Sequence, residues 1–105
     1  MAEQMGAISP RFRDWAFSVS YGEVYRRGVL SLRDRQLVTL GVVAVLGGCE
    51  SQLKRHMHAA LNAGLTPEEL VEAVIQITVY GGAPRGSNAI RAAADVVRER
   101  GERLP

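Results

Sequence analysis

The sequence predicts an all-α fold, a compact bundle of about five to six helices that assembles into an oligomer. Glycine, proline and helix-capping residues divide the chain into five segments with short connections. Within these segments apolar residues recur at helical spacing, and no segment shows the alternation of a strand. The chain has 105 residues, 47% of them hydrophobic and 23% charged. We therefore expect a single domain that spans residues 1–105.

The first predicted helix begins at Ser9, whose hydroxyl can cap the helix while Pro10 takes its first position. We expect its continuation to end after Arg27, at Gly28. The apolar side chains that we expect to point inward are Phe12, Trp15, Ala16, Val19 and Val24.

The second predicted helix begins at Ser31, with Asp34 placed to satisfy amide groups of the first turn. Residues 37–46 are almost entirely apolar, and Gly47 and Gly48 end the helix. A surface helix would carry polar residues on its outer side. This helix is therefore expected either at the centre of the fold or between subunits.

The third predicted helix runs from about Glu50 to Ala63 and ends at Gly64. Thr66, with Pro67 and Glu69, then forms a capping box that starts the fourth helix. The residues expected to pack inward are Leu53, Met57, Ala60 and Leu61 in the third helix, and Leu70, Val71, Val74, Ile75, Thr78 and Val79 in the fourth.

Gly81, Gly82 and Pro84 separate the fourth helix from the last one, which ends at Gly101. This helix is rich in alanine, and arginines lie opposite its apolar face. The apolar face comprises Ile90, Ala93, Ala94 and Val97.

Charge and composition limit the possible partners. The net charge is +2, and arginines alternate with acids rather than forming a basic block. This pattern argues against a nucleic-acid partner and favours a small anionic ligand. The apolar runs are interrupted by glycines, and residues 1–10 lack the pattern of a signal peptide, so we expect no membrane association. A small core leaves apolar helical surface to cover, which predicts a homo-oligomer, a trimer or a hexamer.

Cys49, Gln52 and His56 are the catalytic candidates. Their spacings of three, four and seven residues place a thiol, an amide and an imidazole on nearly one helical face. The alternative is that His56 is a structural hydrogen-bonding residue and Cys49 a small buried apolar one. His58 is two positions from His56 and points elsewhere, so a helical zinc pair is not expected. A single cysteine permits no internal disulfide and suits the cytoplasm.

Two further groups are candidates for substrate binding. Tyr21, Tyr25, Arg27 and Arg35 lie around the connection between the first two helices, where guanidinium and phenol groups could bind carboxylates. Tyr80 precedes a glycine-rich turn that could hold an anion at a helix start. The alternative is that the arginines are solvated, the tyrosines border the core, and the turn is only a tight connection.

The sequence resembles the carboxymuconolactone decarboxylase family, which includes alkylhydroperoxidase D, from about Phe12 to Arg100. The strongest blocks are LSLRDRQLVTLGVVAVLGG and QLKRHMHAALNAGLTPEELVEAVIQITVYGGAPRGSNAI. They contain the family's histidine, its Gly-Leu-Thr-Pro-Glu-Glu turn and its Tyr-x-Gly-x-Pro element. Residues 21–30 are similar to the Trp-Gly-x-Val-Trp-x-Arg-Pro-Gly-Leu stretch of the decarboxylase branch. Tyrosines replace both tryptophans, and Gly28 replaces the proline.

The resemblance implies an alkylhydroperoxidase D-like bundle and a decarboxylase that needs neither metal nor cofactor, because the lactone carbonyl of the substrate accepts the electron pair. It implies that Arg27 and Arg35 anchor carboxylates, Tyr21 or Tyr25 donates to the developing oxyanion, and His56 donates the proton. One alternative is a thiol peroxidase that uses Cys49 and His56. The peroxidase branch has Cys-x-x-Cys before its histidine, whereas Gln52 takes the second position here. A non-catalytic ligand-binding protein is the other alternative.

Overall fold

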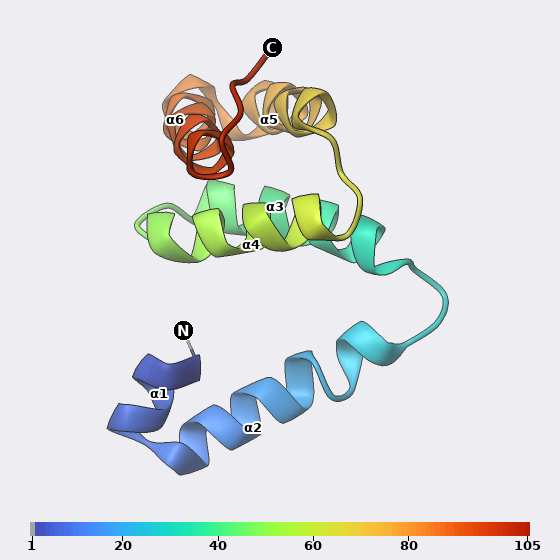
Figure 1. The fold of residues 1–105 in the computed structure, drawn as a ribbon, viewed down its shortest axis with the longest axis vertical. Coiled ribbons are helices and arrows are strands. Elements are labelled where there is room, and N and C mark those ends of the chain that lie inside the picture. Colours follow the sequence, from blue (N-terminus) through green and yellow to red (C-terminus); the bar gives the residue numbers. More distant parts are fainter. Residues whose placement is uncertain (1) are drawn as a thin grey trace. The chain divides into compact units, whose positions relative to one another are not determined.

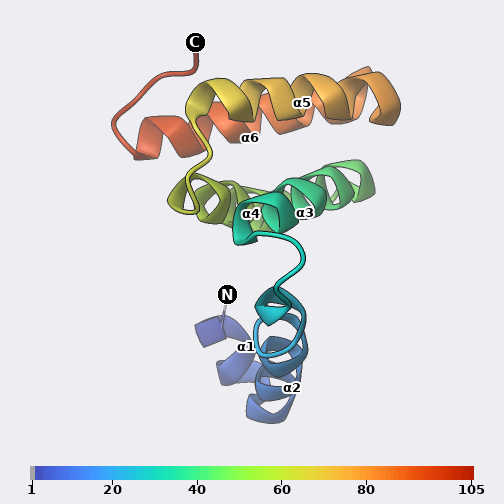
Figure 2. The same cartoon turned by 90° about the vertical axis from the view of Figure 1, so that its right-hand side faces the viewer.

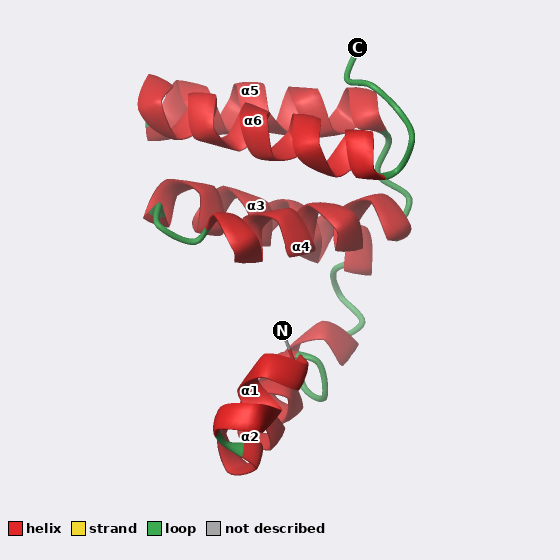
Figure 3. Cartoon of the chain, turned by 60° about the vertical axis from the view of Figure 1, so that its left-hand side comes forward, coloured by secondary structure: helices red, strands yellow, loops and turns green. Residues whose placement is uncertain are grey.

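A computed structural model describes residues 2–105, and within that range every regular element is helical. The elements form two units, one ending at Ser31 and the other beginning at Leu32. Figures 1 and 3 trace them along the chain. In order they are α1 (Ala2–Ile8), α2 (Pro10–Ser20), a short 3₁₀ helix (Val24–Arg26), α3 (Leu32–Leu46), α4 (Glu50–Asn62), α5 (Pro67–Gly81) and α6 (Ala83–Glu99).

The first unit contains α1, α2 and the 3₁₀ helix. The predicted cap of α2 is confirmed, since Ser9 Oγ accepts a hydrogen bond from the amide of Phe12 at 3.2 Å. The helix ends at Ser20, earlier than predicted. Gly22 permits the turn that follows, because a Cβ there would lie 2.5 Å from the carbonyl oxygen of Ser18. The 3₁₀ helix takes the place of the helical continuation that was predicted to reach Gly28.

The prediction that the apolar side chains of α2 point inward is wrong for a single copy of the chain. No residue of α2 is buried, and Trp15 is 63% exposed. Two adjacent helices and a short turn offer too little surface to enclose a core. The exposed residues are Phe12, Trp15, Val19 and Val24.

The second unit contains α3 to α6, arranged as two layers of paired helices. Figures 1 and 2 show α3 beside α4 and α5 beside α6. Buried side chains from all four helices and the α4–α5 connection fill the space between the layers. The buried apolar residues are Leu40, Ala44, Leu53, Met57, Ala60, Leu65, Leu70, Val74, Ile77, Ala89, Ala92, Ala93, Val96 and Val97.

The predicted helix boundaries of this unit are largely confirmed. Gly47 and Gly48 follow α3, and Gly64 follows α4, all with positive φ. The capping box of α5 is present, because Thr66 Oγ1 accepts from the amide of Glu69 at 3.1 Å and Glu69 Oε1 accepts from the amide of Thr66 at 3.0 Å. The α5–α6 connection is shorter than predicted and consists of Gly82 alone.

Several predicted core positions are exposed. On α5 the buried residues are Leu70, Val74 and Ile77, and Ile75 and Val79 therefore point outward. Ala94 of α6 is exposed as well. The outer side of α3 is also apolar, with Val38, Val42, Val45 and Leu46 exposed. None of the helices in residues 2–105 has the length and apolar character needed to cross a lipid bilayer.

Candidate functional site

His56 lies on α4 and is paired with a side chain of α3. Its Nδ1 is 3.0 Å from Oε1 of Gln36, across the interface between the two helices. Gln36 is only 2% exposed, whereas the imidazole is half-buried. Within residues 32–105, His56 Nε2 has no hydrogen-bond partner. The ring is therefore anchored through one of its two nitrogens.

Partial burial determines the ionisation of this imidazole. Removal from water disfavours the charged ring and lowers the pKa of His56 below its ordinary value of 6.5. The ring is therefore mostly neutral at neutral pH. An imidazole can take up and release a proton, which is the property required of a group that carries a proton during a reaction.

Cys49 occupies the N-cap position of α4, but its side chain does not cap the helix. The half-buried thiol instead donates toward the carbonyl oxygens of Val43, at 3.3 Å, and Gly47, at 3.5 Å. Within residues 32–105, no hydrogen bond joins Cys49 to His56. The thiol is held by the α3–α4 connection.

Gln52 is exposed on α4, one turn before His56. Cys49, Gln52 and His56 thus lie on successive turns from the start of α4. The structure nevertheless pairs His56 with Gln36, not with Cys49 or Gln52. His58, as predicted, faces elsewhere: its Nε2 is 2.9 Å from Glu99 and its Nδ1 is 3.2 Å from Arg100.

Tyr21, Tyr25 and Arg27 belong to the first unit, where the rings of the two tyrosines pack together. The ring of Tyr21 stacks on Phe17, with centroids 5.3 Å apart, and on Tyr25, at 5.0 Å. Burial, together with neighbouring Tyr25, raises the pKa of Tyr21. The phenol therefore stays protonated and can act as a hydrogen-bond donor. That these residues act with His56 stays a prediction.

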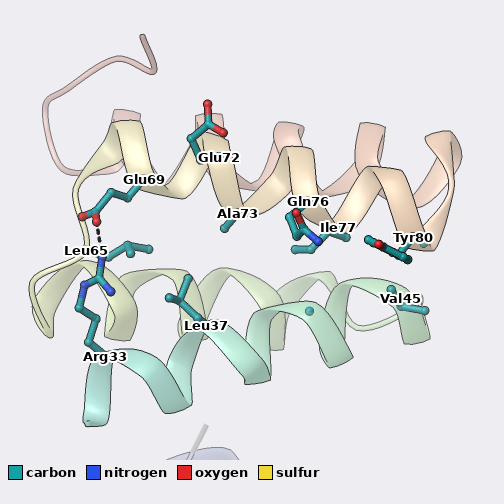
Figure 4. Close-up of a pocket in the computed structure, with 12 residues that line it drawn as sticks. Arg33, Leu37, Val45, Leu65, Glu69, Glu72, Ala73, Gln76, Ile77 and Tyr80 are labelled. Atoms are coloured by element: carbon teal, nitrogen blue, oxygen red, sulfur yellow. Dashed lines mark hydrogen bonds and ion pairs between the residues drawn. The ribbon is translucent and has the colours of Figure 1, made fainter. Parts of the chain in front are cut away.

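The second unit contains a cleft of about 680 Å³ between α3 and α5. Figure 4 shows an ion pair between Arg33 and Glu69 at one end and Tyr80 at the other. Leu37, Gly41 and Val45 contribute from α3, and Ala73, Gln76 and Ile77 from α5. Tyr80 is 84% exposed, so its hydroxyl is accessible from solvent. His56 does not line this cleft, and Arg35, a predicted substrate ligand, is half-buried elsewhere on α3.

Sequence reasoning did not single out Gln36 or the Arg33–Glu69 pair. Gln36 precedes the apolar run of α3, yet it shares a face with buried Leu40 and Ala44 at four-residue spacing. A polar residue in register with a buried row was the available signal. The Arg33–Glu69 pair joins residues that are far apart in the chain, and their spacing gives no such signal.

The sequence has counterparts among known proteins. Residues 10–95 match the carboxymuconolactone decarboxylase family, and the chain belongs to this family. It is 31% identical to 4-carboxymuconolactone decarboxylase of Acinetobacter baylyi over 94% of this chain and 73% of that protein. This agreement confirms the resemblance inferred from the sequence.

Two further relatives are similar over shorter stretches. An uncharacterised 15.0 kDa protein of Paracoccus denitrificans is 34% identical over 78% of this chain and 62% of its own length. Nitrosuccinic acid decarboxylase of Metarhizium robertsii is 35% identical over 68% of this chain and 46% of its own length. The present chain thus spans less than two thirds of either of these proteins.

Proposed function

We propose that the protein is a cofactor-independent decarboxylase of a small carboxylated substrate of the muconolactone type. The observation that carries the proposal is the half-buried His56, anchored through Nδ1 to buried Gln36 in a member of the carboxymuconolactone decarboxylase family. Two relatives are named as decarboxylases, which supports the same class of reaction.

The names of these two substrates suggest a common chemistry. Each compound carries a carboxyl group together with an electron-withdrawing group, a lactone carbonyl in one and a nitro group in the other. Such a group accepts the electron pair of the carbon–carbon bond that breaks as carbon dioxide leaves. The protein then has to bind the anion, stabilise the developing negative charge and supply one proton to carbon.

In our proposal His56 supplies that proton. The bond between the substrate carbon and its carboxylate breaks, and the electron pair moves into the conjugated carbonyl. The pair returns to form a carbon–hydrogen bond with a proton from the imidazolium of His56, which becomes neutral. The net reaction consumes one proton and releases one carbon dioxide.

We assign the binding of the substrate to arginines and tyrosines. Arg27 and Arg35 are assigned to substrate carboxylates, because a guanidinium group can form two hydrogen bonds with one carboxylate. Tyr21 or Tyr25 is assigned to the developing oxyanion, and the raised pKa of Tyr21 keeps a phenolic proton available for donation. Tyr80 lines the α3–α5 cleft, which His56 does not, so the proposed reaction at His56 does not depend on its predicted contact with the substrate.

The proposal is tested by mixing the purified protein with 4-carboxymuconolactone and following the loss of lactone absorbance. We expect turnover by the unaltered protein and a loss of 10²–10⁴-fold in kcat for His56→Ala, the range that general acid catalysis contributes. His58→Ala is the matched control, because His58 bonds Glu99 and Arg100 instead. The absence of turnover, or equal turnover by His56→Ala, would overturn the proposal.

Cys49→Ser separates decarboxylation from thiol chemistry in the same assay. The proposed reaction does not use the thiol, so we expect the variant to retain lactone turnover. If the protein instead consumes a hydroperoxide with a thiol donor, and Cys49→Ser abolishes this, the redox alternative replaces the proposal. If an aromatic acid binds tightly without turnover, the ligand-binding alternative replaces it.

We also propose that the protein acts as a homo-oligomer, a trimer or a hexamer, in the cytoplasm. The outward apolar residues of α3 and α5 support assembly, because exposed apolar surface of this kind is stabilised by a protein partner. Light scattering coupled to size-exclusion chromatography measures the mass. A monomer at micromolar concentration would contradict the proposal.

A further inference from the structure

Gln36 occupies a position that packing alone would assign to an apolar residue. It lies on the buried face of α3 in register with Leu40 and Ala44, and only 2% of its surface is exposed. Burying a carboxamide costs free energy unless its polar atoms find partners, and an apolar side chain would carry no such cost. The carboxamide oxygen has a partner, the imidazole of His56. This pairing points to a role that involves the ring.

We infer that Gln36 is a positioning residue that fixes His56 in the tautomer with its proton on Nδ1. A carboxamide oxygen can only accept a hydrogen bond, so Nδ1 at 3.0 Å from Oε1 must be the donor. A neutral imidazole carries one proton, which leaves Nε2 with a lone pair. Gln36 thus determines which ring nitrogen exchanges protons with a ligand.

The neutrality of the carboxamide matters as much as its position. A carboxylate in the same place would favour the charged ring, whereas Gln36 can accept from Nδ1 whether the ring is neutral or protonated. Burial alone accounts for the lowered pKa of His56, with no contribution from a charged side chain of the described residues. The ring is thus held in one orientation in both protonation states.

The consequence for catalysis rests on the proposed decarboxylase function. The free protein holds His56 neutral, and Nε2 takes up a proton from solvent when an anionic substrate arrives nearby, since a neighbouring negative charge stabilises the imidazolium. The same proton is then delivered to the substrate carbon. Gln36 keeps Nδ1 hydrogen-bonded throughout, so the ring need not rotate between uptake and delivery.

The inference is tested without substrate by nitrogen NMR of the protein with isotope-labelled imidazole rings. The chemical shifts of the two ring nitrogens distinguish the Nδ1-protonated tautomer from the Nε2-protonated one, and a His58→Gln variant assigns the signals of His56. We expect His56 to be predominantly Nδ1-protonated in the unaltered protein. Gln36→Met, which keeps a similar volume but has no carbonyl oxygen, should shift the ring toward Nε2 protonation.

Gln36→Glu provides a second, independent readout. It retains an accepting oxygen and adds a negative charge, so the Nδ1 tautomer should persist while the midpoint of the His56 titration moves upward. A predominantly Nε2-protonated ring in the unaltered protein would overturn the inference, and so would a tautomer that Gln36→Met leaves unchanged. A midpoint that Gln36→Glu does not raise would also overturn it.

Kinetics separates this inference from the proposed function. With 4-carboxymuconolactone as substrate, Gln36→Met should lower kcat by up to about a hundredfold, with a smaller change in KM, because a misplaced reacting group loses the geometry that the reaction needs. If the NMR result holds but the unaltered protein does not turn over the lactone, the proposed function fails and the positioning role stands. If turnover occurs and Gln36→Met leaves kcat unchanged, the catalytic consequence of the positioning role is refuted.

Discussion

Replacement of two helical glycines by alanine should change stability in opposite directions. Gly86 is buried in α6 against α5, and a Cβ there would lie 2.7 Å from Cβ of Thr78 and 2.8 Å from its Cγ2. Carbon atoms pack favourably at about 3.5–4.0 Å, so one of the helices must move by about 1 Å. Thr78 cannot yield easily, because its side chain is branched at Cβ and its hydroxyl donates to the carbonyl of Val74 at 2.7 Å.

Two effects of Gly86→Ala compete. Alanine stabilises a helix interior by about 1 kcal/mol relative to glycine, whereas overpacking a core costs roughly 1–3 kcal/mol. The short distances place the overpacking cost near its upper end, so we expect a net loss of about 1–2 kcal/mol. That corresponds to a fall in Tm of about 4–15 °C for a domain of this size.

Gly41→Ala is the matched control. Gly41 also lies inside a helix, α3, but a Cβ there meets nothing within 4 Å. Only the helix propensity then changes, and we expect a gain of about 1 kcal/mol. Urea unfolding of both variants, followed by circular dichroism at one protein concentration, measures the two differences. Equal effects, or a Gly86→Ala variant more stable than the unaltered protein, would refute the packing argument.

Three further predictions concern local interactions. Thr66→Ala removes the cap of α5 and should lower the free energy of unfolding by about 1 kcal/mol. Arg33→Met removes partly exposed ion pairs to Glu69 and Asp34 and should cost less than about 1 kcal/mol. Thermal unfolding compares the two variants, and a larger loss for Arg33→Met would contradict this ranking. Because burial lowers the pKa of His56, the unfolded chain binds a proton more readily, and stability should fall as the pH drops through the ordinary value of 6.5. Urea unfolding at several pH values should show a weaker acid dependence for His56→Gln; an identical dependence would contradict the burial argument.

Local sequence signals predicted the helices of the second unit well. The capping box at Thr66 and the glycines after α3 and α4 act through bonds between near neighbours, so their effect can be read from a short stretch of sequence. The buried rows were harder to predict. Val71, Val74, Ile75 and Val79 are all apolar on α5, and which side of the helix is covered depends on where α3 and α6 pack.

The candidate site could be predicted only in part. Its histidine followed from residue type and family motif, but the partner of that histidine lies twenty positions away, and only the packing of α3 on α4 brings it within 3.0 Å. The exposure of Trp15 was equally beyond local reasoning. An amphipathic pattern predicts that an apolar face will be covered, without identifying what covers it.

The measurement that addresses decarboxylation most directly uses 4-carboxymuconolactone with an isotope-labelled carboxylate carbon, in heavy water. Our account predicts that each molecule consumed releases one labelled carbon dioxide and gains one carbon-bound deuterium, and that both events slow together in His56→Ala. Consumption of the lactone without labelled carbon dioxide, or release at the same rate from His56→Ala, would contradict it.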